Sequence, residues 1–258
     1  MENKGVFNFL FLLSFIFVSS CTYTSGEGPI IEREVSLVSF SGVELDGSFD
    51  VSIDQGVSQK VMVVGNENII EKLELNVEGG VLQLRLEPGS YLNYDLEVRI
   101  TIPDLESAVL LGSGDIRIGT FVGLDDVRIK LDGSGDIVTT EESVLESTTS
   151  MNIVLDGSGD IDLKVKAVEL NAALQGSGDI DLIGVAETLR AELDGSGDIK
   201  AYDLKVVNAE AVLDGSGSIK LFVTEHLRAN LDGSGDITYR GAPVVEQTLD
   251  GSGTISPK

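Results

Sequence analysis

The amino-acid sequence predicts an all-β protein built as a parallel β-solenoid (a β-helix-like fold), with coils of 18–24 residues and a more irregular β region before them. The first observation is a repeat, Leu-x-Gly-Ser-Gly-x-Ile, which occurs eight times. The second is an alternation of apolar and polar residues on both sides of each repeat, the period of strands with one buried face. The third is that no stretch of the repeats shows the 3.6-residue period of a helix. The Gly-Ser-Gly units begin at Gly112, Gly133, Gly157, Gly176, Gly195, Gly215, Gly233 and Gly251.

The Gly-Ser-Gly unit fits either a hairpin turn of an antiparallel meander or a corner between stacked strands. Identical side chains at identical positions favour the solenoid, because stacked coils place like over like. Glycine suits a tight corner because it adopts positive φ without a Cβ clash. We therefore expect the leucine before each unit and the isoleucine after it, for example Leu193 and Ile199, to point into the core.

The N-terminus predicts a lipoprotein signal peptide over residues 1–20. Lys4 is followed by an apolar run that is too short to span a bilayer and typical of a signal-peptide core. The run ends in Val18-Ser19-Ser20-Cys21, which resembles the lipobox of bacterial lipoproteins. We therefore predict lipidation at Cys21, attachment to the membrane through this N-terminal lipid, and a place in the bacterial cell envelope as an outer-membrane lipoprotein, facing either the periplasm or the cell surface. The alternative is ordinary secretion with an unmodified cysteine.

The rest of the chain is predicted to be a tether followed by one domain. Residues 21–30 are mostly small and polar, as in a flexible tether. Residues 31–258 form a single β-solenoid domain, in which 31–110 is the irregular part and 111–258 contains the regular coils. Since Cys21 is the only cysteine, no disulfide can form within the chain.

The irregular part also consists mainly of predicted strands. Residues 45–51 look like a degenerate copy of the repeat, and 61–64 form a buried strand. Residues 67–72 fit one helical turn, and 73–77 with 81–86 fit a hairpin. Residues 96–102 alternate as a strand that Pro103 ends.

This order of motifs resembles a known family. The stretch Asp-Gly-Ser-Phe-Asp-Val, the valine-rich strand, Gly-Asn-Glu-Asn-Ile-Ile, the hairpin, Ile-Pro-Asp-Leu and the Gly-Ser-Gly-Asp-Ile coils are together similar to the "putative auto-transporter adhesin, head GIN" family. The resemblance covers roughly residues 35–258. It implies a secreted or lipid-anchored bacterial envelope protein with a β-solenoid-like fold, but it implies no ligand and no functional residues.

Composition argues against binding of nucleic acid and against recognition of sugars by aromatic stacking. The formal net charge of −25 and the pI near 4.1 argue against nucleic acid, whose phosphates the chain would repel. Tryptophan is absent and aromatic residues make up 5%, which provides little for stacking on sugars. A hydrophobic content of 42% nevertheless predicts a folded protein.

Two columns of aspartates are expected along the solenoid. One hypothesis is calcium binding, as in the β-rolls of secreted toxins, because Ca²⁺ prefers carboxylate and carbonyl oxygens. The other, which we favour, is that each aspartate accepts N–H bonds at its own corner. Aspartate follows the repeat unit at Asp115, Asp136, Asp160, Asp179, Asp198 and Asp236, and precedes it at Asp132, Asp156, Asp194, Asp214, Asp232 and Asp250.

The sequence predicts no catalytic, cofactor-binding or metal residues. His226 is the only histidine and is expected on the surface, and a serine in every repeat is unlike a single nucleophile. The predicted function is that of a non-catalytic, lipid-anchored envelope protein, a scaffold or an adhesion-type surface for a cell-surface glycan or protein. The alternatives are a β-helix carbohydrate-active enzyme and a calcium-binding β-roll-like protein.

Overall fold

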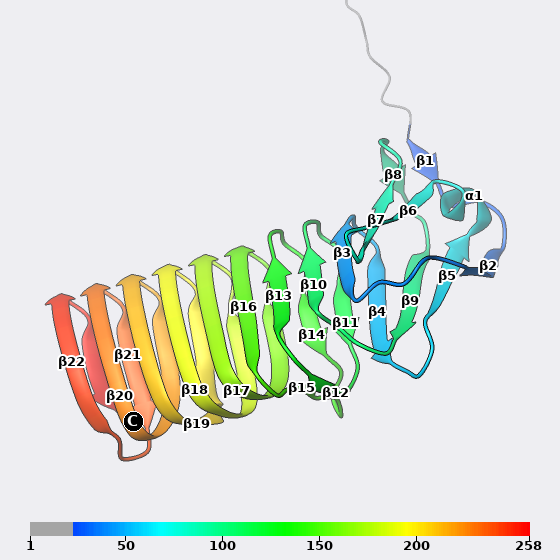
Figure 1. Cartoon of the computed structure of the whole chain (residues 1–258). Coiled ribbons are helices and arrows are strands. Elements are labelled where there is room, and N and C mark those ends of the chain that lie inside the picture. Colours follow the sequence, from blue (N-terminus) through cyan, green and yellow to red (C-terminus); the bar gives the residue numbers. More distant parts are fainter. Residues whose placement is uncertain (1–22) are drawn as a thin grey trace, which may run out of the picture.

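The computed structural model describes residues 23–258 and contains a parallel β-solenoid of about eight turns with coils roughly 20 residues apart (Figure 1). The predicted fold class is therefore confirmed. The predicted signal peptide and Cys21 lie outside the described residues. Within residues 23–258, the single helix, α1 (Glu67–Ile70), is far too short to cross a membrane.

The strands follow one another with short connections. In chain order they are β1 (Thr24–Ser25), β2 (Ile30–Val35), β3 (Gly42–Asp46), β4 (Asp50–Gln55), β5 (Lys60–Asn66), β6 (Leu73–Glu78), β7 (Val81–Leu86), β8 (Tyr91–Leu92), β9 (Leu96–Ile102), β10 (Ser107–Leu110), β11 (Ile116–Ile118), β12 (Phe121–Leu124), β13 (Val127–Leu131), β14 (Ile137–Thr139), β15 (Leu145–Ser147), β16 (Ser150–Gly157), β17 (Ile161–Gly176), β18 (Ile180–Gly195), β19 (Asp198–Gly215), β20 (Ser218–Gly233), β21 (Asp236–Arg240), β22 (Val244–Gly251) and β23 (Thr254–Pro257).

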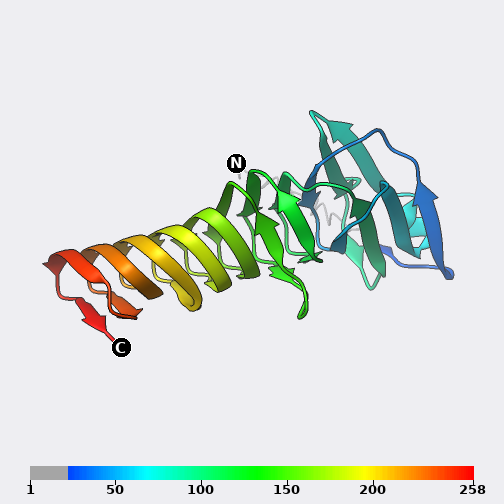
Figure 2. The ribbon, with the colours of Figure 1, turned by 60° about the horizontal axis from the view of Figure 1, so that its bottom comes forward.

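The regular coils stack in parallel register. Leu174 of β17 pairs with Leu193 of β18, which pairs with Leu213 of β19. The first regular coils consist of short strands, β11 to β13 and then β14 to β16. In β17, β18, β19 and β20 these segments merge into continuous strands of 16–18 residues that bend around the core, and the last coil is again made of shorter strands (Figure 2).

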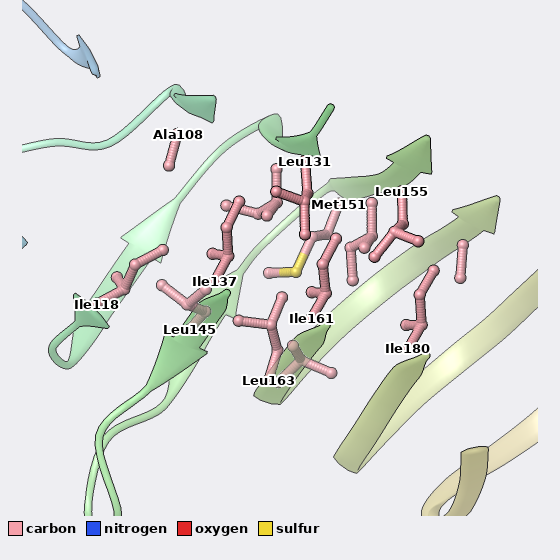
Figure 3. Close-up of a cluster of buried hydrophobic side chains, with 14 of the residues drawn as sticks. Ala108, Ile118, Leu131, Ile137, Leu145, Met151, Leu155, Ile161, Leu163 and Ile180 are labelled. Carbon is pink, nitrogen blue, oxygen red and sulfur yellow. The ribbon is translucent and has the colours of Figure 1, made fainter. Parts of the chain in front are cut away.

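The core is a stack of inward-facing aliphatic side chains. Leu193 and Ile199 are 2% and 0% exposed, so the predicted orientation of the repeat is confirmed. Figure 3 shows the rows in the first regular coils, where Met151 takes a leucine position and pairs with Leu170 of the next coil. Burying a leucine or isoleucine side chain contributes about 1.5–3 kcal/mol, and each coil adds several.

The two glycines of each corner are required for different physical reasons. The first glycine has positive φ in the later coils, for example 153° at Gly195, as the repeat predicted. The second glycine allows close stacking, because a Cβ on Gly197 would lie 1.9 Å from the carbonyl oxygen of Gly178. Neither position accepts a side chain without movement of the backbone.

The N-terminal region does not stack in chain order. Strands β3 and β4 form the coil on which β10 and β11 stack, and β7 and β9 lie on the other side of that coil. After β3 and β4 the chain therefore builds β7 and β9 on one side of that coil. It then crosses to the other side, where β10 and β11 begin the regular stack. Antiparallel β2, β5 and β6 complete this end of the sheet (Figure 1).

The separate elements expected in this region are present. The helical turn is α1, the hairpin is β6 with β7, and the strand that Pro103 ends is β9. The degenerate repeat is a true coil position, since Leu45 pairs with Leu110 and Gly112 packs directly on the backbone of Gly47.

Part of the segment expected to be a tether is attached to the domain. Strand β1 pairs with β8, where Thr24 N–H donates to the carbonyl of Ser90 at 2.7 Å. The Asn68 side chain then donates to the Ser25 carbonyl and accepts the N–H of Glu27, each at 2.8 Å. From Thr24 on, these contacts differ from the flexible chain that composition indicated.

Candidate functional site

The aspartates that follow the Gly-Ser-Gly unit join neighbouring coils. The Oδ1 of Asp160 accepts the backbone N–H of Asp179 at 2.9 Å, and Asp179 accepts that of Asp198 at 2.9 Å. The same bond links Asp115 to Asp136 and Asp136 to Asp160, at 3.1 Å each. The expectation that each carboxylate bonds to its own corner is therefore wrong in detail, because its acceptor serves the next coil.

Cations and hydroxyls balance part of this column. Lys200 Nζ donates to Oδ2 of Asp179 at 2.7 Å, and Lys220 Nζ donates to Oδ2 of Asp198 at 2.8 Å. Partial burial acts to raise the pKa of Asp198, but hydrogen bonds from Lys220 and Ser218 outweigh it and lower that pKa. Six of these carboxylates thus have a structural use that needs no metal.

The aspartates that precede the unit form a separate, exposed column. Asp194, Asp214, Asp232 and Asp250 stand in register on successive coils. At a coil spacing of about 4.8 Å, neighbouring carboxylates repel by about 1 kcal/mol in water, which solvent and salt can screen. Within the described part of the chain, no three Asp, Glu, His or Cys side chains are grouped to hold a metal ion. Calcium binding stays the alternative hypothesis, to be tested by titration.

A hollow of about 350 Å³ lies outside both columns. One wall comes from the connection between β14 and β15, where Lys164 Nζ donates to the carbonyl of Glu141 at 2.9 Å. This connection belongs to the longest repeat spacing, 24 residues from Gly133 to Gly157, against 19 for the next. The extra residues therefore build the wall. The hollow is lined by Thr139, Thr140, Glu141, Asp162, Leu163, Lys164, Asp181 and Ile183.

Two carboxylates meet in this hollow. Asp162 and Asp181 occupy the same position of adjacent coils and are paired in register. Partial burial raises the pKa of Asp162, and the neighbouring charge of Asp181 raises it further. Burial likewise raises the pKa of Asp181, although Lys200 opposes the change. Carboxylates of this kind can accept hydrogen bonds from hydroxyl groups of a ligand. We had not singled out this pair from the sequence; the long spacing was the available signal.

The remaining candidates from the sequence lie on the surface. His226 is exposed, as expected, and pairs in register with Asn208 and Val244. The serines of the corners form an exposed column, in which the hydroxyls of Ser196 and Ser216 are 3.5 Å apart. The structure does not bring any of them together with the Asp162–Asp181 pair.

Comparisons with known proteins agree with this architecture. A family model described as "Putative auto-transporter adhesin, head GIN domain" matches residues 39–243. A solved structure described as a putative lipid binding protein from Parabacteroides distasonis is 27% identical, with a TM-score of 0.82 over 92% of this chain and 100% of that chain.

Two further solved structures show the same fold. A putative adhesin from Parabacteroides merdae is 21% identical, with a TM-score of 0.81 over 92% of this chain and 99% of that one. A putative adhesin from Bacteroides fragilis is 23% identical, with a TM-score of 0.68 over 91% and 100%. No curated protein matches the sequence.

Proposed function

The chain belongs to the putative auto-transporter adhesin, head GIN domain family, and from that premise we propose that it is a lipid-anchored envelope protein whose solenoid is an adhesion-type binding surface. The family model matches residues 39–243, which include most of the coils, and we therefore place the binding surface on the coils. Membership in an adhesin family supports a place at the cell surface or in the envelope.

The observation that carries the binding role is the hollow beside β14, β17 and β18. It is the place among the described coils where the longest connection interrupts the regular stack and where two aspartates, a glutamate, a lysine and two threonines line one hollow. Polar groups of this kind fit a ligand rich in hydroxyl groups, such as a cell-surface glycan, whereas they offer no aromatic platform.

The test is binding of the purified protein to a glycan array and to whole cells. Asp181→Asn should reduce binding, because it removes one carboxylate of the hollow and keeps the side-chain size. Asp194→Asn is the matched control, since Asp194 is exposed on another face and equally changes the charge by one. Equal loss of binding by both variants would mean that overall charge, and not the hollow, is responsible.

The anchor is the second part of the proposal. The lipobox-like sequence Val18-Ser19-Ser20-Cys21 supports it. Cys21→Ala should move the protein from the membrane fraction to the soluble fraction. Retention of this variant on the membrane would contradict lipid attachment at Cys21.

A carbohydrate-active enzyme is a second candidate, favoured by the Asp162–Asp181 pair alone. Glycosidases use two carboxylates at a defined separation. Incubation with polysaccharides should then release reducing ends, and Asp162→Asn or Asp181→Asn should abolish the release. We expect no release, because adhesins bind their ligands without consuming them.

A further inference from the structure

The sheet formed by β1 and β8 projects from the N-terminal region and exposes apolar side chains. Figure 1 shows these two strands at the top of the molecule, beyond β6 and β7. Tyr23, which precedes β1, is 61% exposed, and Leu92 at the end of β8 is 50% exposed. Large apolar groups grouped on a surface commonly mark a contact with another phase or molecule.

The two strands of this projection carry no charged side chain in a strongly acidic protein, and the charges beside them, Lys72 and Glu87, form an ion pair. Residues 88–94 read Pro-Gly-Ser-Tyr-Leu-Asn-Tyr and residues 22–26 read Thr-Tyr-Thr-Ser-Gly, with no acidic or basic side chain in either segment. The whole chain has 43 acidic and 18 basic residues. A neutral surface that presents tyrosine and leucine fits the interface of a bilayer, where tyrosine is enriched, better than open water.

The projection is also rigidly held. Thr24 N–H donates to Ser90 and Gly26 N–H donates to Asn93, at 2.7 and 3.2 Å. The hydroxyl of Tyr91 donates to the carbonyl of Glu87 at 2.8 Å, and its ring packs edge-on against Tyr94. The exposed side chains therefore sit on a fixed platform.

The position of the expected lipid on Cys21 indicates that the β1–β8 sheet contacts the membrane surface. Tyr23 follows Cys21 by two residues, and two residues span at most about 7 Å. Because the chain is pinned from Thr24 on, a lipid on Cys21 would hold β1 and β8 at the headgroups and not at the end of a loose tether.

We propose that Tyr23 and Leu92, carried by the β1–β8 sheet, enter the interfacial region of the membrane and fix the orientation of the solenoid on it. This inference rests on the lipid anchor of the proposed function. The turn between β4 and β5, on the opposite side of the N-terminal region in Figure 1, then faces away from the membrane. Its Val57 is fully exposed.

The absence of tryptophan makes a direct test available. Single-tryptophan variants Leu92→Trp and Tyr23→Trp report the platform, and Val57→Trp is the matched control at an exposed apolar position. The full chain, processed in a bacterial host, is reconstituted into vesicles of phosphatidylethanolamine and phosphatidylglycerol, with or without brominated acyl chains. Flotation measures attachment, and tryptophan fluorescence measures contact with the lipid.

We expect the vesicles to carry all three variants. Brominated lipid should quench most of the fluorescence of Leu92→Trp and Tyr23→Trp and blue-shift their emission, whereas Val57→Trp should stay unquenched. Flotation without quenching at residues 23 and 92, or with equal quenching at residue 57, would overturn the inference and leave the anchor intact. Failure to float would remove the anchor, and the inference with it.

Discussion

Asp179 and Asp198 stand on adjacent coils, and the Oδ1 of Asp179 accepts the backbone N–H of Asp198 at 2.9 Å while its Oδ2 accepts Lys200. The carboxylate thus supplies an acceptor to an N–H group of the next corner, and a lysine offsets its charge. This arrangement explains how a column of like charges is compatible with a stack of coils about 4.8 Å apart.

Removal of this acceptor should weaken the stack. Asp179→Ala leaves the N–H of Asp198 without its partner, which costs about 1–3 kcal/mol where water replaces the bond poorly. Asp179→Asn should cost less, because the amide oxygen can still accept and only the exposed ion pair with Lys200 is lost. Urea denaturation measures both. Equal destabilisation by the two variants would show that the ion pair matters more than the N–H bond.

The leucine of the repeat should contribute according to its place in the stack. Leu193→Ala, in a middle coil where the side chain is 2% exposed, should cost about 2–5 kcal/mol because it leaves a cavity. Leu249→Ala is the control, since the same repeat position in β22 is 48% exposed. Its cost should be much smaller. The midpoint of thermal unfolding separates the variants, and similar values for the two would contradict the packing.

The corner glycines can be separated from the serine between them. Gly197→Ala places a Cβ 1.9 Å from the carbonyl oxygen of Gly178, so the coils must shift, at a cost of about 1–3 kcal/mol or more. Ser196→Ala, one residue away, changes an exposed side chain and should leave stability nearly unchanged. A soluble Gly197→Ala protein with an unaltered melting temperature would disprove close stacking at the corner.

The regular coils were predictable because each repeat contains the local pattern that determines its buried face and its corner. The alternation around Leu193 and Ile199 defines the buried face, and the recurrence of Gly-Ser-Gly defines the stacking register. The order of coils in the N-terminal region was not predictable in this way. Strands β7 and β9 stack on β3 and β4 by side-chain fit between segments distant in the chain, which no local period encodes.

The candidate site was only partly visible in the sequence. The repeat predicted a column of aspartates that includes Asp179 and Asp198. It did not predict the bond from the Asp198 N–H to Asp179, because that bond depends on how adjacent coils are offset along the solenoid axis. Asp162 and Asp181 looked like ordinary outward residues of two strands, and only the fold shows that the long connection before β15 rises beside them. The sequence shows which residues repeat, whereas the structure was needed to show that the irregular connection before β15 lies beside Asp162 and Asp181.

Removal of divalent cations should leave the protein stable. Six carboxylates already bond to the next coil, and the exposed column can be screened within about 8–10 Å by ordinary salt. Chelation should therefore change the melting temperature only slightly. Bound calcium would instead add about 2.7 kcal/mol at a hundred times its dissociation constant. Stoichiometric heat in a calcium titration, lost in Asp198→Asn, would establish a calcium site.

The hollow should give stability an opposite pH dependence from that of the aspartate ladder. The pKa of Asp162 is raised in the folded protein by partial burial and by Asp181, so the folded state binds more protons than the unfolded state between the ordinary and the raised pKa. This contribution to stability therefore falls as pH rises through that window. Asp198, with a lowered pKa, contributes stability above its unfolded pKa that is lost as pH falls through its folded pKa.

Matched amide variants test these signs. At neutral pH, Asp162→Asn removes repulsion with Asp181 and should raise the unfolding free energy by about 0.2–1 kcal/mol, the scale of exposed charge pairs. Asp198→Asn should lower it, because the ion pair with Lys220 is lost. Melting temperatures recorded from about pH 3 to pH 7, a range that includes the ordinary pKa of aspartate, measure both effects. A loss of stability in Asp162→Asn at neutral pH would mean that the carboxylate is stabilised in the hollow, which the burial and the neighbouring charge argue against.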